Sequence, residues 1–179
     1  MKKATTLVLG GCKSGKSRHA LFLADKISTN NKIFVATSVP ADSEMQERVS
    51  AHKKERGDGF MTIEEPLAIS EVIGKNSQKA DVILIDCLTL WISNMLYKEY
   101  DKKKILHHTD TLARTLNKTE CSVILVSNEV GAGIVPENKL ARQFRDIAGI
   151  VNQKIANAVS DVVLIVAGIP VNIKEKNHV

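Results

Sequence analysis

A glycine-rich segment near the start of the chain has the residue types and spacing of a phosphate-binding loop. Residues 10–17 read Gly-Gly-Cys-Lys-Ser-Gly-Lys-Ser, between an apolar run at 6–9 and a helix-compatible stretch at 18–24. Gly10 and Gly15 allow backbone N–H groups to point at phosphate oxygens, and the positive end of the next helix adds to the attraction. A simple glycine-rich turn is the alternative, but the spacing, the Lys-Ser ending and the flanking elements all favour a P-loop. The segment predicts nucleoside triphosphate binding.

Three side chains have the chemistry needed for a magnesium-nucleotide site. Lys16 is expected to reach the β and γ phosphates, and the Ser17 hydroxyl can bind a magnesium ion that bridges them. Asp86 follows the four apolar residues 82–85, which is typical of a Walker B carboxylate that holds magnesium directly or through water. Asp86 could also cap a following helix, and the two roles can coexist.

The elements that must position these residues form an alternating pattern. Strands are expected at 4–9, 32–36, 81–85, 122–126 and 161–166, with longer helix-compatible segments between them. Such alternation predicts an α/β fold with a mostly parallel sheet flanked by helices. The continuously apolar runs 82–85 and 123–126 suit central strands that are buried on both faces.

The last third of the chain is expected to contain two long helices and a hairpin. Segments 102–118 and 137–159 have helical apolar spacing. The run 169–173 follows the strand at 161–166 too closely for a crossover helix, so it should pair antiparallel with that strand. We expect one P-loop nucleotide-binding domain over residues 1–179, with a flexible tail at 174–179.

Polar residues follow several expected strands at the edge where ligands bind in open parallel sheets. The segments that end the strands and carry these polar residues are Ala36-Thr37-Ser38, Asp86-Cys87 and Ser127-Asn128-Glu129. The last group could equally be turn formers.

A charged segment at 42–56 is nearly devoid of apolar residues, so it is either a solvated surface helix or a ligand-facing one. Within it, His52 lies close to Lys53, Lys54 and Arg56, whose positive field favours a neutral, nucleophilic imidazole. Composition alone favours an ordinary surface histidine.

Composition narrows the class of protein. The chain has 179 residues, 44% of them apolar, and a net charge of +5 that suits a phosphorylated ligand. Nucleic-acid binding is not expected, because the basic clusters lack interleaved aromatic residues. The three cysteines have no metal-ligand spacing, as expected of reduced thiols inside a cell. We found no signal sequence and no membrane span, and expect a soluble cytoplasmic protein.

Several motifs, taken in order, resemble the bifunctional adenosylcobinamide kinase/adenosylcobinamide-phosphate guanylyltransferase family of cobalamin assembly. The resemblance runs from about residue 4 to residue 173. It rests on residues 10–18, 36–38, Glu44-Met45, Arg48, His52-Lys53, 128–131, 133–138, Phe144-Arg145-Asp146, Gly149 and Asn152-Gln153.

This resemblance implies a RecA-like P-loop fold, a ring-like homotrimer and two reactions on a corrinoid. In the first, the γ-phosphate of ATP or GTP passes to the hydroxyl of adenosylcobinamide. In the second, a histidine attacks the α-phosphorus of GTP and holds GMP, which the phosphate of adenosylcobinamide phosphate then takes. The product is adenosylcobinamide-GDP, and pyrophosphate is released.

Carried over residue by residue, the resemblance makes His52 the guanylylated nucleophile, with Lys16 as the second catalytic residue. It implies GTP binding by Gly10, Gly11, Cys12, Lys13, Ser14, Gly15, Lys16, Ser17, Ala36, Thr37, Ser38, Lys53, Lys54, Glu55, Arg56, Glu64 and Asp86. Magnesium would be held by Ser17 and Asp86. The sequence departs from the family pattern at Ala51, Gly57, Phe60 and Asp86, and none of these departures removes a reacting group.

Two alternatives stay open at this point: a plain small-molecule kinase with a structural His52, and a non-catalytic nucleotide-gated protein. The nucleotide preferred in the kinase step and the corrinoid-binding residues are not given by the sequence.

Overall fold

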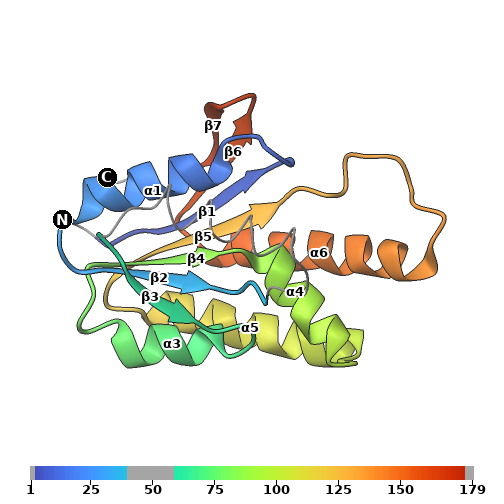
Figure 1. Cartoon of the computed structure of the whole chain (residues 1–179), viewed down its shortest axis with the longest axis horizontal. Coiled ribbons are helices and arrows are strands. Elements are labelled where there is room, and N and C mark those ends of the chain that lie inside the picture. Colours follow the sequence, from blue (N-terminus) through green and yellow to red (C-terminus); the bar gives the residue numbers. More distant parts are fainter. Residues whose placement is uncertain (1–2, 40–58, 176–179) are drawn as a thin grey trace.

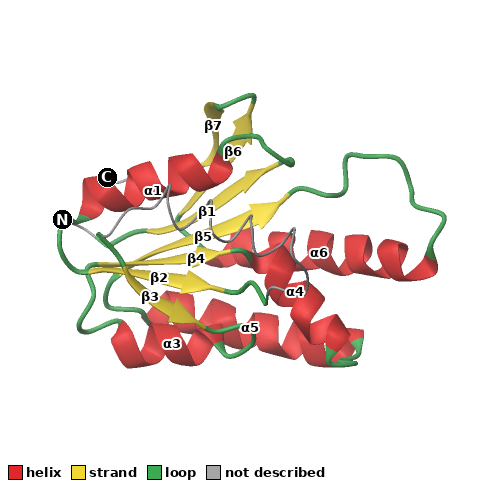
Figure 2. Cartoon of the chain, viewed as in Figure 1, coloured by secondary structure: helices red, strands yellow, loops and turns green. Residues whose placement is uncertain are grey.

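The computed structural model describes residues 3–39 and 59–175, and within them one sheet of seven strands is covered by helices on both faces (Figures 1 and 2). The strand order is β3-β2-β4-β5-β1-β6-β7. The strands are β1 (Thr5–Gly10), β2 (Lys32–Ala36), β3 (Met61–Glu64), β4 (Val82–Asp86), β5 (Ser122–Asn128), β6 (Asp161–Val166) and β7 (Ile169–Lys174). All neighbouring strands are parallel except β6 and β7. The prediction of an α/β fold with a C-terminal antiparallel pair is confirmed.

The strands predicted to be central are β4 and β5, and they lie in the middle of the sheet. Their apolar side chains are almost completely buried because helices cover both faces. The edge strand β3 was missed by the sequence analysis. Three of its four residues are exposed, so it lacks the apolar run that marks a buried strand.

Five helices are described, and Figure 1 shows α1 on one face of the sheet and α3, α5 and α6 on the other. They are α1 (Lys16–Ile27), α3 (Ile69–Asn76), α4 (Leu88–Tyr97), α5 (Lys102–Lys118) and α6 (Lys139–Ala158). The bounds of α5 are those predicted, whereas α6 is shorter than the predicted 137–159 because Asn138 caps it. The Asn138 Oδ1 accepts a hydrogen bond of 3.1 Å from the Ala141 N–H.

The sheet separates two apolar cores. On the α1 face, Ala20 and Ala24 pack with Val8, Leu84 and Val126. The other face buries the alternate strand residues, such as Leu7, Ile83 and Leu125, against α3, α4, α5 and α6. This alternation shows which side chains at the strand ends project toward α1 and the P-loop.

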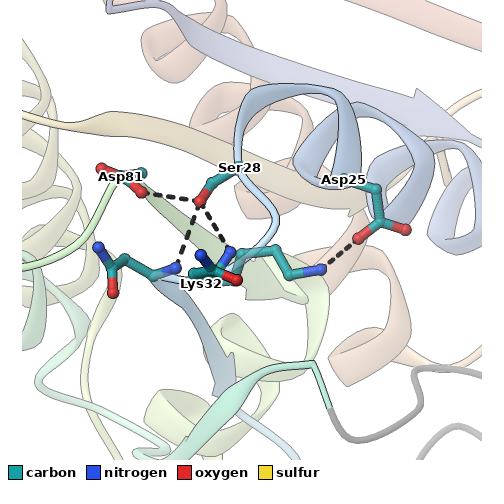
Figure 3. Close-up of polar contacts among 6 residues, drawn as sticks. Asp25, Ser28, Lys32 and Asp81 are labelled. Carbon is teal, nitrogen blue, oxygen red and sulfur yellow. Dashed lines mark hydrogen bonds and ion pairs between the residues drawn. The ribbon is translucent and has the colours of Figure 1, made fainter.

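The turn between α1 and β2 is fixed by polar contacts (Figure 3). The Ser28 hydroxyl donates to Asp81 at 2.7 Å and accepts from the backbone of the two residues that precede Lys32. Lys32, which is 8% exposed, forms an ion pair with Asp25 and lies 4.5 Å from the centre of the Phe60 ring. Phe60, the residue immediately before β3, therefore packs against Lys32 at the start of β2.

No helix in the described part of the chain is both long and apolar enough to cross a membrane.

Candidate active site

The predicted phosphate loop joins β1 to α1, as its sequence context requires. Gly15 is the N-cap of α1 and has a φ of 96°, a left-handed conformation that favours glycine. The Lys16 ammonium donates a hydrogen bond of 3.1 Å to the Gly11 carbonyl. This places the lysine over its own loop, at the N-terminal end of a twelve-residue helix, where a phosphate group would be attracted.

The loop is packed against the turn between β6 and β7. A side-chain carbon added to Gly10 would lie 2.4 Å from the Ser14 Oγ and 2.9 Å from the Ile165 carbonyl, so the position requires glycine. The Gly168 N–H donates to the Ser14 carbonyl at 2.8 Å. The predicted hairpin thus also supports the curvature of the phosphate loop, a role that the sequence analysis did not assign to it.

Two predicted acidic residues lie in one row at the carboxyl edge of the sheet. Ala36 at the end of β2 is the register partner of Glu64 in β3 and of Asp86 in β4. Register partners in neighbouring strands project on the same face. Ala36 packs into the core on the α1 face, so both carboxylates project on the face from which α1 leaves the P-loop. Glu64, inferred only from the family resemblance, thereby lies on the same face and at the same level as Asp86, with Ala36 of β2 between them.

Thr37, predicted to belong to the nucleotide-binding segment, has a side chain that contacts the end of β4. It is completely buried, and its hydroxyl accepts from the Cys87 N–H at 2.8 Å and donates to the Cys87 carbonyl at 2.9 Å. Its backbone N–H donates to the Asp86 carbonyl, and its own carbonyl accepts from the Asn94 side chain at 2.7 Å. All polar groups of Thr37 are therefore bonded within the protein. The structure supports a positioning role, holding the ends of β2 and β4 together.

The cysteines near the site differ in accessibility. Burial raises the pKa of the Cys87 thiol, and the neighbouring Asp86 carboxylate raises it further. This thiol stays protonated at neutral pH and is a poor nucleophile. Cys12, in the phosphate loop, is exposed. The peptide bond between Asp86 and Cys87 is cis.

Residues 40–58 lie outside the described part of the chain, and with them the predicted His52, Lys53, Lys54, Glu55 and Arg56. The described residues on either side are Val39, beyond the carboxyl end of β2, and Gly59, before β3. The chain that carries His52 therefore leaves the sheet at the edge where the P-loop lies. The assignment of the nucleophile stays a prediction.

The residues predicted to bind magnesium suit that ion. Ser17 lies in the first turn of α1, and Asp86 ends β4 on the same face of the sheet. Among the described residues there is no cluster of three or more histidine, cysteine or acidic side chains that could hold a metal alone. Magnesium usually takes one or two protein oxygens and completes its shell with phosphates and water, which agrees with this arrangement.

Comparisons with known proteins identify close relatives. A family model described as cobinamide kinase / cobinamide phosphate guanyltransferase matches residues 6–173. The bifunctional adenosylcobalamin biosynthesis protein CobU of Escherichia coli (strain K12) is 38% identical over 180 residues, which cover 94% of this chain and 98% of the relative. The protein CobP of Pseudomonas aeruginosa, with the same description, is 36% identical over 171 residues, with 94% and 96% covered.

Solved structures support the fold. A protein of Pyrococcus horikoshii OT3 superposes with a TM-score of 0.57 at 14% identity, covering 98% of this chain and 88% of that one. The RadB recombinase superposes with a TM-score of 0.53 at 14% identity, covering 90% and 73%. These similarities agree with the P-loop α/β architecture built above.

Proposed function

The chain belongs to the cobinamide kinase / cobinamide phosphate guanyltransferase family, and we propose that both of its transfers take place at the P-loop edge of the sheet. It is an adenosylcobinamide kinase and adenosylcobinamide-phosphate guanylyltransferase of cobalamin biosynthesis, with ATP and GTP as its nucleotide substrates. This location of the active site is supported by the row of Glu64, Ala36 and Asp86, which lies on the sheet face from which α1 leaves the P-loop.

In the kinase step, the loop amides and the start of α1 hold the phosphates. Lys16, now bonded to the Gly11 carbonyl, exchanges that partner for phosphate oxygens and stabilises the charge that develops during transfer. Ser17 and Asp86 would hold magnesium, which when bound neutralises phosphate charge. The substrate hydroxyl forms a bond to the γ-phosphorus as the bond from that phosphorus to the β-phosphate oxygen breaks.

In the guanylyl step, a ring nitrogen of His52 attacks the α-phosphorus of GTP, and pyrophosphate leaves from the P-loop. A phosphate oxygen of adenosylcobinamide phosphate then attacks the same phosphorus, the nitrogen–phosphorus bond breaks and His52 is regenerated. The covalent intermediate divides the transfer into two displacements. Lys53 and Arg56 provide positive charge for the phosphates beside the nucleophile, and Lys54 and Glu55 belong to the same GTP-contacting segment.

Further proposals concern the rest of the site and the assembly. The segments at the ends of β2 and β3 that carry Ala36, Thr37, Ser38 and Glu64 contact the nucleotide, and the buried Thr37 hydroxyl also positions the end of β2. The chain acts as one domain on small molecules and not on nucleic acid. It forms a homotrimer, as the family resemblance implies, which light scattering on the purified protein would measure.

The test of the bifunctional assignment is product formation in sequence. With adenosylcobinamide and ATP, chromatography should reveal adenosylcobinamide phosphate, and later addition of GTP should convert it to adenosylcobinamide-GDP. Phosphorylation without any GDP derivative would limit the protein to a kinase.

A further inference from the structure

Asn128, at the end of β5, lies close to the proposed nucleotide site but is not one of the residues that bind phosphate or magnesium there. β5 lies between β4, which ends in Asp86, and β1, which leads into the P-loop. Asn128 is the register partner of Gly10, the first residue of that loop, and Val126 is the partner of Asp86. The amide therefore ends the strand that separates the magnesium-binding carboxylate from the phosphate loop.

The Asn128 side chain projects on the P-loop face of the sheet. Val126, two residues earlier in β5, packs in the core on the α1 face. Since side chains alternate along a strand, Asn128 projects to the same face as Val126. Asp86, the register partner of Val126 in β4, projects to this face too. Ser127 projects to the opposite face, where its hydroxyl donates to Asn152 of α6 at 2.7 Å. The alternation thus directs Asn128 toward the nucleotide and Ser127 toward α6.

Asn128 has a buried acceptor without a partner. Its Oδ1 is buried and accepts no hydrogen bond from any described residue, and the same holds for the Ser14 Oγ. The Ser14 hydroxyl occupies the space that a Gly10 side chain would take, so the two unpaired groups lie at neighbouring positions on one face. Leaving a buried polar atom unpaired is energetically costly, so such atoms usually have a partner in the working protein.

The backbone of Asn128 is held in place from two sides. Asn152, which is 6% exposed, donates from its Nδ2 to the Asn128 carbonyl at 3.2 Å. The next N–H along the chain, from Glu129, donates to the Gly10 carbonyl at 3.0 Å. These bonds fix the backbone at the end of β5 and leave the Asn128 Oδ1 without a partner among the described residues.

We propose that the Asn128 Oδ1 accepts a hydrogen bond from an O–H group beside the terminal phosphate, and so positions that group for phosphoryl transfer. The inference rests on the nucleotide site proposed above. Phosphate oxygens are acceptors and cannot satisfy a carbonyl oxygen, whereas the alcohol of the substrate or a metal-bound water can. A neutral amide orients the hydroxyl but does not remove its proton, which passes to the transferred phosphate or to solvent. Ser127 and Asn152 are positioning residues that act through Asn128.

The test replaces Asn128 with leucine, which has a similar shape and no polar atoms, and uses Asn157→Leu as the matched control. Asn157 is exposed near the end of α6, far along the chain from the P-loop. We expect Asn128→Leu to lower the kcat of the kinase step by about 10- to 100-fold while the KM for ATP changes little, because orientation and not binding is lost. Asn157→Leu should match the unmodified protein.

Two further readouts separate the sources of the O–H. If the substrate alcohol is the donor, covalent GMP formation from GTP labelled at the α-phosphorus should be retained, because that step does not use the alcohol. If a metal-bound water is the donor, both steps should weaken, and the magnesium concentration for half-maximal rate should rise. Asn152→Ala should lower the kinase kcat less than Asn128→Leu, and the double variant should resemble Asn128→Leu alone.

The proposal is overturned if Asn128→Leu and Asn157→Leu have equal rates, or if all rates fall only in proportion to lost thermal stability. Asn128→Ala provides the same comparison if the leucine variant does not fold. Lys16→Ala tests the underlying site separately. If Lys16→Ala retains phosphoryl transfer, the proposed nucleotide site is wrong, whereas an inactive Lys16→Ala beside a fully active Asn128→Leu refutes only the role of Asn128.

Discussion

A single hydroxyl group joins Thr37 to Cys87, accepting from the Cys87 N–H at 2.8 Å and donating to the Cys87 carbonyl at 2.9 Å. The two residues follow β2 and β4, the strands whose ends carry Ala36 and Asp86. The Cys87 carbonyl also accepts from the Trp91 N–H at 3.1 Å, whereas the Cys87 N–H donates to the Thr37 hydroxyl. The Thr37 side chain therefore holds the residue that follows Asp86 next to the end of β2.

Thr37→Val should destabilise the fold, because valine keeps the shape but leaves the buried Cys87 N–H without its Thr37 acceptor, while the Cys87 carbonyl keeps the hydrogen bond from Trp91. We expect a loss of about 1–3 kcal/mol in the free energy of unfolding, measured by urea denaturation. Thr37→Ser retains the hydroxyl and is the control. Equal free energies of unfolding for the valine and serine variants would show that the hydrogen bonds of the Thr37 hydroxyl do not stabilise the fold.

Asp86→Asn should slow catalysis because it weakens magnesium binding, and it should have a smaller effect on the stability of the fold. Removing the negative charge should lower the kinase kcat by about 100-fold or more and raise the magnesium concentration for half-maximal rate. Asp81→Asn is the matched control, since Asp81 precedes the same strand at the opposite edge, where it accepts from Ser28. An unchanged magnesium dependence in Asp86→Asn would exclude Asp86 as a ligand.

Thiol reactivity should distinguish Cys12 from the two buried cysteines. A thiolate is the reactive form, and burial raises the pKa of both Cys87 and Cys121. At pH 8 an alkylating reagent should therefore modify Cys12 first, and mass spectrometry would locate the adduct.

GTP with magnesium should protect Cys12 if the loop surrounds the phosphates, and Cys12→Ala should resist inactivation by the reagent. Modification at an equal rate with and without nucleotide would argue against phosphate binding at this loop.

Much of the fold could be predicted because its strands are buried on both faces. Continuous apolar runs identified β4 and β5, and the short connection after β6 identified β7 as antiparallel. β3 could not be found in this way, because it is exposed and four residues long. Burial produces the pattern that sequence reasoning detects, so an exposed edge strand leaves little signal.

Candidate site residues could be proposed from the sequence where a motif dictates the residue type, but not where contacts between distant segments give a residue its role. The P-loop and Asp86 were identified by motif and by their place after apolar runs, and the structure brings them to one edge. The positioning role of Thr37 depends on a contact across 50 residues, which no local pattern reveals. Asn128 looked like a possible turn former, and only the strand order places it between Asp86 and Gly10.

The central claim, a covalent guanylyl-histidine at His52, is tested most directly with GTP labelled at the α-phosphorus. The unmodified protein should retain label that is acid-labile and base-stable, as expected of a phosphoramidate, and His52→Ala should lose it while still binding GTP. His107→Ala, on the exposed surface of α5, should label normally. Label that persists in His52→Ala would contradict the account, because the nucleophile would then be another residue.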